Sequence, residues 1–169
     1  MEIETGLLKI REAKVRDITK IMEVRFSVKE NVLSNPALVT EKENIEYLTV
    51  RGKGWVCEIN TNIVGFAIAD LKDHSIWALF VKPEYERKGI GKNLHDTMLD
   101  WYFNQSNAKV WLGTAANTRA EIFYKASGWV EISRKEKAAS SPSSLPWTEI
   151  KFEMTFADWK KTKSSYKSL

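Results

Sequence analysis

The sequence predicts a single α/β domain in which helices flank a mixed, mainly antiparallel sheet. Two observations support this fold class. Short apolar or β-branched runs alternate with segments whose apolar residues recur at helical spacing, in the order strand, two helices, three strands, helix, strand, helix, two strands. The chain of 169 residues is long enough for one sizeable core and too short for two ordinary domains. We therefore expect one domain over residues 1–156.

Six elements are expected in the first half of the chain. Thr40 and Glu43 have capping-box spacing, which predicts that a helix begins there. Turn-forming residues at 60–62 separate two apolar runs and indicate a β-hairpin. The expected elements are a strand at 7–11, helices at 15–26 and from Thr40, and strands at 55–59, 63–69 and 76–81. The last three strands are expected to form an antiparallel meander.

The second half begins with a central helix expected over residues 89–104. A strand near 110–112 follows it. Because a helix connects this strand to the one at 76–81, the two must run parallel. The remaining elements are a short helix at 117–127 and strands at 131–135 and 149–156. Residues 138–146, between the last two strands, are rich in Ser and Pro and predict a long loop.

The composition excludes several classes of function. Hydrophobic residues make up 43% of the chain and charged residues 28%, which is typical of a soluble globular protein. No apolar run is long enough to cross a bilayer, so no membrane partner is expected. The N-terminal residues lack the layout of a signal peptide, and the single cysteine, Cys57, permits no intrachain disulfide. The expected location is cytoplasmic.

Most of the net positive charge lies at the C-terminus. The chain carries a net charge of +4, and residues 157–169 contain four lysines and one aspartate, which gives +3 of it. This segment is expected to be a solvated basic tail outside the domain. The rest of the chain has no basic stripe interleaved with aromatic residues, so no nucleic-acid partner is expected.

Residues 76–94 are typical of a strand, a phosphate-binding turn and a helix. The first N–H groups of a helix have no intrahelical partner, and the helix dipole places partial positive charge beside them. Gly89 and Gly91 would let the backbone close around an anion there. Additional positive charge comes from Arg87, Lys88 and Lys92. The stretch therefore predicts a site for a phosphate group, and an ordinary helix N-terminus is the alternative.

Two better-known phosphate motifs do not fit this stretch. A dinucleotide-binding fingerprint needs a third glycine where Leu94 stands. A P-loop needs a glycine where Glu86 stands and a hydroxyl where Asn93 stands. The phosphate site must therefore be of another kind.

Three motifs, taken in order, resemble those of the GNAT N-acetyltransferases. They are the strand Leu79-Phe80-Val81 followed by Pro83-Glu84-Tyr85, the turn Glu86-Arg87-Lys88-Gly89-Ile90-Gly91, and the run Asn117-x-x-Ala120-x-x-Phe123-Tyr124-x-x-x-Gly128-Trp129. The resemblance spans roughly residues 10–156 and implies a sheet that splays between its two central parallel strands. Glu86 departs from the family's turn pattern, which usually begins with Gln or Arg.

The resemblance implies that acetyl-CoA is the cosubstrate. In such proteins the central strand pairs with the pantetheine arm, which corresponds here to Leu79, Phe80 and Val81. The turn then holds the pyrophosphate through Arg87, Lys88, Gly89, Ile90, Gly91 and Lys92. Asn117 matches a position that contacts the cofactor, and Tyr124 matches the usual general acid.

Acetyl transfer to an amine needs an acid and a base but no metal. A tyrosine hydroxyl such as that of Tyr124 is a suitable proton donor to a departing thiolate. The helix pattern alone favours a core aromatic at this position, and the resemblance to the family reverses that preference. Glu58, on a strand next to the central one, is a candidate base. Asp70 and Asp73 are expected to be solvated turn residues. Strand register decides which face Glu58 occupies, and the sequence does not fix it.

The acceptor is predicted to be a primary amine of a small molecule. Its expected contacts are Arg25, Glu30, Asn31 and Trp55, with a surface ion pair as the alternative for the first three. A protein N-terminus or lysine is the second acceptor class, and a non-catalytic acyl-CoA-binding domain is a further alternative. A homodimer would be compatible with this architecture. His74 and His95 are expected at the surface.

Overall fold

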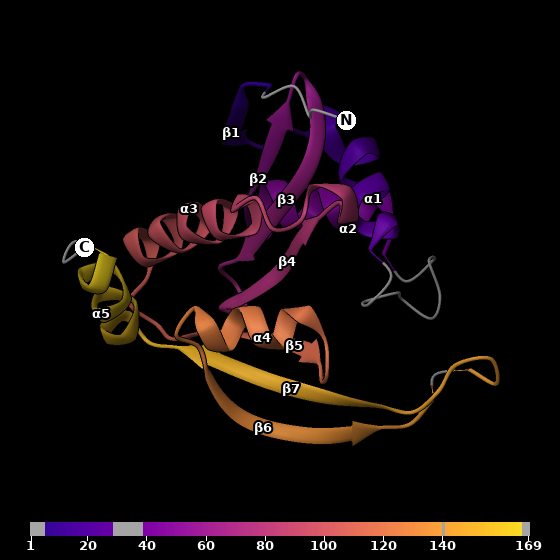
Figure 1. Cartoon of the computed structure of the whole chain (residues 1–169), viewed down its shortest axis with the longest axis vertical. Helices are drawn as coiled ribbons and strands as arrows, with labels where there is room; N and C mark the ends of the chain where they lie inside the picture. The colour runs from indigo at the N-terminus through magenta and orange to yellow at the C-terminus, as the bar shows by residue number, and fades with distance from the viewer. Residues whose placement is uncertain (1–5, 29–38, 140, 167–169) are drawn as a thin grey trace.

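The computed structural model describes residues 6–28, 39–139 and 141–166, and its elements follow the predicted order with one helix added at the end (Figure 1). The strands are β1 (Leu8–Glu12), β2 (Gly52–Ile59), β3 (Asn62–Asp70), β4 (Ser75–Val81), β5 (Val110–Ala115), β6 (Val130–Lys137) and β7 (Trp147–Met154). The α-helices are α1 (Ile18–Ser27), α2 (Glu41–Glu46), α3 (Ile90–Gln105), α4 (Arg119–Ala126) and α5 (Phe156–Tyr166). The expected capping box forms at α2, where Thr40 and Glu43 each accept a hydrogen bond from the other's backbone N–H.

The described strands form one seven-stranded sheet in the order β1-β2-β3-β4-β5-β7-β6. All neighbouring pairs are antiparallel except β4 and β5, which run parallel as the connecting helix requires. Side chains of α3, α4 and α5 join one apolar cluster, whereas α1 packs into a second cluster with β2, β3 and β4. Helices therefore cover both faces of the sheet, and the predicted mixed α/β fold is confirmed.

The two central strands separate soon after they meet. Within the described residues, β4 and β5 share the pair Ser75 and Trp111, beside which the Trp111 backbone N–H donates to the His74 carbonyl over 2.9 Å. On its other edge β4 pairs with β3, and the Lys82 N–H donates to the Val64 carbonyl over 2.8 Å. Backbone groups alternate in direction along an antiparallel ladder, so those of Leu79 and Val81 face the gap between β4 and β5. The sheet thus has an open backbone edge in its middle.

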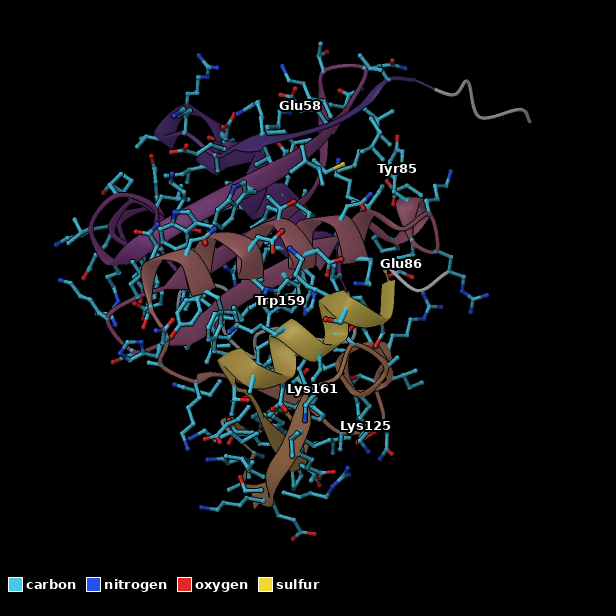
Figure 2. The ribbon with its side chains drawn as sticks, turned by 90° about the vertical axis from the view of Figure 1, so that its left-hand side faces the viewer. Glu58, Tyr85, Glu86, Lys125, Trp159 and Lys161 are labelled. Atoms are coloured by element: carbon cyan, nitrogen blue, oxygen red, sulfur yellow. The ribbon has the colours of Figure 1, made fainter. Side chains whose placement is uncertain are left out.

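The C-terminal segment differs from the expected solvated tail. Residues Phe156–Tyr166 form α5, and Trp159 is only 3% exposed. Figure 2 shows Trp159 between α5 and α3, where its ring lies 6.4 Å from that of Phe103 and 5.9 Å from that of His95. The many lysines predicted a solvated tail. A helix with a narrow apolar face can nevertheless pack on the core through a large aromatic residue, which here is Trp159. None of the described helices is long and apolar enough to span a membrane.

Candidate functional site

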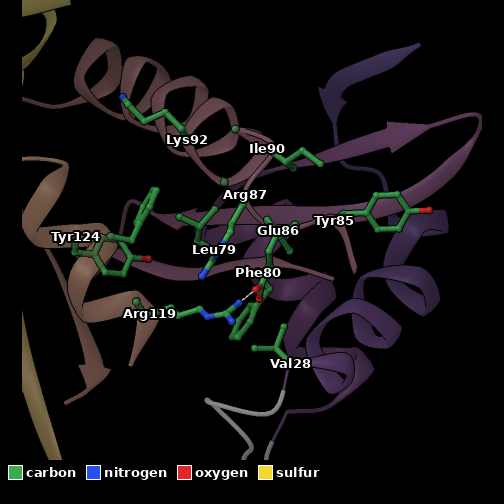
Figure 3. A pocket seen from close by; sticks show the side chains of 15 residues that line it. Val28, Leu79, Phe80, Tyr85, Glu86, Arg87, Ile90, Lys92, Arg119 and Tyr124 are labelled. Carbon is green, nitrogen blue, oxygen red and sulfur yellow. Dashed lines mark ion pairs between the residues drawn. The ribbon is translucent and has the colours of Figure 1, made fainter. Parts of the chain in front are cut away.

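A cavity of about 430 Å³ opens where β4 ends and α3 begins, with α4 on its far side (Figure 3). The lining brings together most of the residues predicted to bind the cofactor. They are Leu79, Phe80, Val81, Arg87, Gly89, Ile90, Gly91, Lys92 and Tyr124. The remaining wall comes from Val28, Tyr85, Glu86, Arg119, Ala120 and Phe123.

The turn before α3 has the geometry of an anion cradle. Gly89 caps the helix with a φ of 78°, and Arg87 has a φ of 60°, so the chain turns sharply enough to aim the first N–H groups of α3 at the cavity. A Cβ on Gly91 would lie 3.8 Å from Val81 and 4.0 Å from Phe123, which are ordinary contact distances. The protein itself would accept a side chain at position 91. The space left by this glycine is therefore free for a guest.

An ion pair crosses the cavity between Glu86 and Arg119 (Figure 3). Glu86 lies in the turn and Arg119 in the first turn of α4, so the pair joins two walls of the cavity. Sequence analysis did not identify Arg119. A basic residue in the first turn of a helix opposes the helix dipole, and that mismatch is the signal by which it could have been found.

Tyr124 projects from α4, and its hydroxyl points into the cavity (Figure 3). The side chain is 7% exposed, and its ring packs against those of Phe123, Trp129 and Phe152 at 5.2, 5.6 and 6.1 Å. Burial raises the pKa of the Tyr124 hydroxyl, so it is protonated at neutral pH. Tyr124 therefore packs in the core and also presents a protonated hydroxyl to the cavity.

A second hollow of about 70 Å³ lies between the separated strands β4 and β5 and shares Leu79, Phe80 and Tyr124 with the larger cavity. Thr114 on β5 also lines it. The Thr114 hydroxyl is buried and has no hydrogen-bond partner among the described residues. Sequence analysis missed this residue. The sequence could have indicated it, because Thr114 follows Val110 and Leu112 at every second position and alternate residues of a strand face the same side.

Two predicted cofactor contacts lie outside the cavity lining. Lys88 is exposed, and its ammonium lies 5.8 Å from the Tyr85 ring centroid. Asn117 is exposed in the turn before α4, with a φ of 60°. The structure brings neither residue into the group that surrounds the cavity.

The candidate base Glu58 lies apart from the cavity. Its carboxylate accepts hydrogen bonds from Arg11 Nε and Nη2 at 2.9 and 2.7 Å, and Arg11 also binds Asp17. Figure 2 shows Glu58 at a distance from Glu86, which lines the cavity. Asp70 is 1% exposed and paired with Arg51 at 2.7 Å, so it is not the solvated turn residue that was expected. The geometry favours an ion-pair role for both carboxylates.

The predicted acceptor contacts separate in the structure. Trp55 packs on the α3 side of the sheet, with its ring 5.5 Å from that of Trp101, and does not line the cavity. Arg25, on α1, is 8% exposed and lies against the ring of Phe80. Glu30 and Asn31 lie outside the described residues. Arg25 therefore contacts a residue of the cavity lining, and its role in binding the acceptor stays a prediction.

His95 is fully buried, so its predicted surface position is wrong. Its Nε2 accepts a hydrogen bond from Trp129 Nε1 over 2.9 Å, and its Nδ1 lies 2.8 Å from an oxygen of Asp96. Because indole N–H can only donate, the proton of neutral His95 must lie on Nδ1, which donates to Asp96. Asp96 in turn binds Lys92 at 2.6 Å. This network connects a cavity residue to the core.

Comparison with known proteins places this geometry in one family. A sequence model described as the Acetyltransferase (GNAT) family matches residues 16–129. No curated protein sequence matches the chain.

Solved structures agree in fold. The ribosomal-protein-S18-alanine N-acetyltransferase from Escherichia coli is 19% identical, with a TM-score of 0.69 over 88% of this chain and 94% of that one. The Salmonella typhimurium protein yncA, solved with its cofactor acetyl-CoA, is 15% identical, with a TM-score of 0.71 over 88% and 93%. A GNAT-family acetyltransferase from Staphylococcus aureus Mu50 is 26% identical, with a TM-score of 0.71 over 88% and 99%.

Proposed function

The chain belongs to the GNAT acetyltransferase family, and from this premise we propose that it transfers the acetyl group of acetyl-CoA directly to a primary amine of a small molecule. The observation that supports the proposal most is the cavity, because it joins three things in one place. They are the open backbone edge of β4, the N-terminus of α3 and the Tyr124 hydroxyl.

The residues present fit acetyl-CoA. The turn from Arg87 to Lys92 supplies the N–H groups of a helix N-terminus, basic side chains and a glycine whose missing Cβ leaves space. The edge of β4 at Leu79 and Val81 supplies backbone donors and acceptors for an amide-containing arm. When bound, acetyl-CoA supplies the activated acyl group.

Each catalytic role can be assigned to an atom of this chain except that of the base. A backbone N–H of the open β4 edge stabilises the negative charge that develops on the acyl oxygen. The Tyr124 hydroxyl donates a proton to the departing sulfur, for which its protonated state is suited. Glu58 is held by Arg11 away from the cavity, so we do not assign the base to it.

A protein N-terminus is the second acceptor class. The printed name of the Escherichia coli neighbour specifies an alanine of ribosomal protein S18, and the folds are alike. A panel of small amines and short peptides separates the two classes by thiol release from acetyl-CoA. A cytoplasmic location and a homodimer remain predictions.

Replacement of Tyr124 tests the catalytic proposal. We expect Tyr124→Phe to lower kcat by roughly 100-fold or more while the affinity for acetyl-CoA stays close to that of the wild type, because only the proton donor is lost. Thiol release gives kcat, and calorimetry gives the affinity. An unchanged kcat would remove Tyr124 as the acid. Acetyl-CoA binding without acetylation of any amine or peptide would instead favour a non-catalytic binding domain.

Replacement of Gly91 tests the cofactor site. Gly91→Leu is expected to weaken acetyl-CoA binding by roughly tenfold or more, which corresponds to about 1.4 kcal/mol, because its side chain fills space reserved for the guest. Gly91→Ala is the matched control, since its Cβ makes only ordinary contacts with Val81 and Phe123. Thermal unfolding should show both variants folded. Equal affinity of Gly91→Leu and the wild type would place the cofactor elsewhere.

A further inference from the structure

Arg25 is a buried cation whose side-chain hydrogen bonds are incomplete among the described residues. The side chain is 8% exposed, and its Nε and Nη2 atoms are buried with no partner in the part of the chain that the structure describes. Buried guanidinium groups are normally paired with carboxylates or carbonyls, because an unpaired one loses its hydration without compensation. This arrangement therefore needs an explanation.

Three aromatic rings surround the Arg25 guanidinium. Its central carbon lies 4.7 Å from the ring centroid of Trp77, 5.1 Å from that of Phe80 and 5.4 Å from that of Phe66. Cation–π attraction offsets part of the lost hydration, but ring faces accept no conventional N–H hydrogen bond. The cage stabilises the charge but leaves Nε and Nη2 without partners among the described residues.

The described carboxylate that acts electrostatically on Arg25 does not satisfy it. Glu43 favours the charged form, but its carboxylate accepts the capping hydrogen bond of Thr40 and makes none with Arg25. Burial dominates and lowers the pKa of Arg25 to about 10, so the guanidinium still carries its charge at neutral pH. Among the described residues, one positive charge without a hydrogen-bonded carboxylate therefore lies inside this cage.

The cage is also part of the wall of the proposed site. Trp77 and Phe80 line the hollow between β4 and β5, and Phe80 lines the larger cavity as well. Val28, whose N–H donates to the Arg25 carbonyl, belongs to the same larger lining. Arg25 approaches this wall from α1, on the face of the sheet opposite α3 and its anion cradle. Arg25 therefore meets the cavity wall at Phe80 and Val28.

We propose that Arg25 binds a carboxylate of the acceptor, so that the acceptor class is a small amine that also carries a carboxylate, an amino acid in the broad sense. This inference rests on the proposed acetyltransferase function. A carboxylate matches the single positive charge and can accept two parallel N–H bonds from one guanidinium. A dianionic phosphate would leave one negative charge unbalanced in the same cage.

The test compares acceptors that differ only in charge. The panel contains the common α-amino acids, β-alanine and 4-aminobutyrate, the amide of each, and aminoethyl phosphate. We expect at least one amino acid to be acetylated with a kcat/KM roughly 10- to 100-fold above that of its own amide, the range of a charge-assisted hydrogen bond. Arg25→Met should abolish this ratio, and Arg25→Lys should retain part of it because the charge remains without the planar pair of donors. Arg16→Met, an exposed position just before α1, is the control and should leave the ratio unchanged.

The outcomes separate the inference from the proposed function. If amides or aminoethyl phosphate are acetylated as well as the acids, the carboxylate inference is wrong and acetyl transfer stands. If no amine is acetylated, the proposed function is wrong, and calorimetry with the N-acetylated amino acids and their amides decides the inference independently of turnover. Binding of the acid forms that is lost in Arg25→Met supports it, and equal or absent binding of both forms overturns it.

Discussion

His95 and Arg25 are both polar side chains in the core, but only one of them has its hydrogen bonds satisfied. His95 is fully buried between Trp129 and Asp96, which engage both of its ring nitrogens. Arg25 is 8% exposed among aromatic rings, and two of its nitrogens have no partner within the described residues. The hydrogen bonds of His95 are complete without a ligand, whereas those of Arg25 are complete only when another group supplies an acceptor.

This difference separates a structural role from a binding role. Satisfied buried polar groups fix one conformation of the core, and His95 in this way holds Asp96 beside Lys92 at the cavity between β4, α3 and α4. Unsatisfied groups reduce the stability of the protein and persist where binding uses them. An apolar substitution is therefore expected to destabilise the protein at His95 but not at Arg25.

The largest expected effect on the free energy of unfolding comes from replacing His95 and Arg25, each in turn, with methionine. His95→Met should lower the free energy of unfolding by about 2–3 kcal/mol, because the Trp129 N–H is left buried without an acceptor. Arg25→Met should leave this free energy within about 1 kcal/mol of the wild type or raise it, because an apolar side chain in the cage removes an unpaired charge. Urea denaturation followed by fluorescence measures both.

The pair of variants can also contradict the comparison. A loss of several kcal/mol in Arg25→Met would mean that the aromatic cage depends on the cation for its stability, and the binding role would lose its physical basis. His95→Gln is the matched control for the histidine, because an amide can accept from Trp129 and should recover part of the loss.

Thr114 extends the comparison to a neutral group and a smaller effect. Among the described residues its hydroxyl, buried at the hollow between β4 and β5, has no hydrogen-bond partner, and neither do Nε and Nη2 of Arg25. Thr114→Val has nearly the same shape and should raise the free energy of unfolding by about 1–2 kcal/mol. If the hydroxyl serves the reaction, kcat falls in the same variant. If Thr114→Val were less stable than the wild type, the Thr114 hydroxyl would have a hydrogen-bond partner in solution.

Most of the fold was predictable from sequence because it depends on local patterns. Helical and alternating periodicity located the strands and the first four helices to within a few residues, and the capping box at Thr40 gave one helix start. The helix α5 was missed because its apolar face consists of few residues, Trp159 chief among them, within a lysine-rich segment. Charge count is a weak guide where one aromatic residue decides the packing.

The site was predictable only in part, for a physical reason. Gly89 and Gly91 revealed the anion cradle because backbone geometry constrains residue type locally. The positions of His95, Glu58 and Arg119 depend on partners distant in sequence, and a single sequence holds no register or packing information for these. Whether a buried polar group is satisfied is therefore visible only in three dimensions.

The smallest predicted effect concerns pH and again distinguishes the two core groups. Burial lowers the pKa of His95 below its usual value of 6.5, and protonation would set its Nε2–H against the Trp129 N–H. The unfolded chain takes up a proton near pH 6.5 and the folded chain does not. The contribution of His95 to stability is therefore complete above that pH and decreases as the pH falls from 7 to 5.5.

His95→Met should remove this dependence, whereas Arg25→Met should retain it, because the pKa of Arg25 of about 10 lies well above this range. The carboxylates with lowered pKa, Asp17, Asp96 and Glu131 among them, lose their contribution only at lower pH, below about 4.5. Urea midpoints measured at pH 7.0, 6.25 and 5.5 isolate the histidine. If the stability of His95→Met depended on pH as strongly as that of the wild type, the titrating group would be another residue. The buried hydrogen bonds of His95 would then not explain the pH dependence.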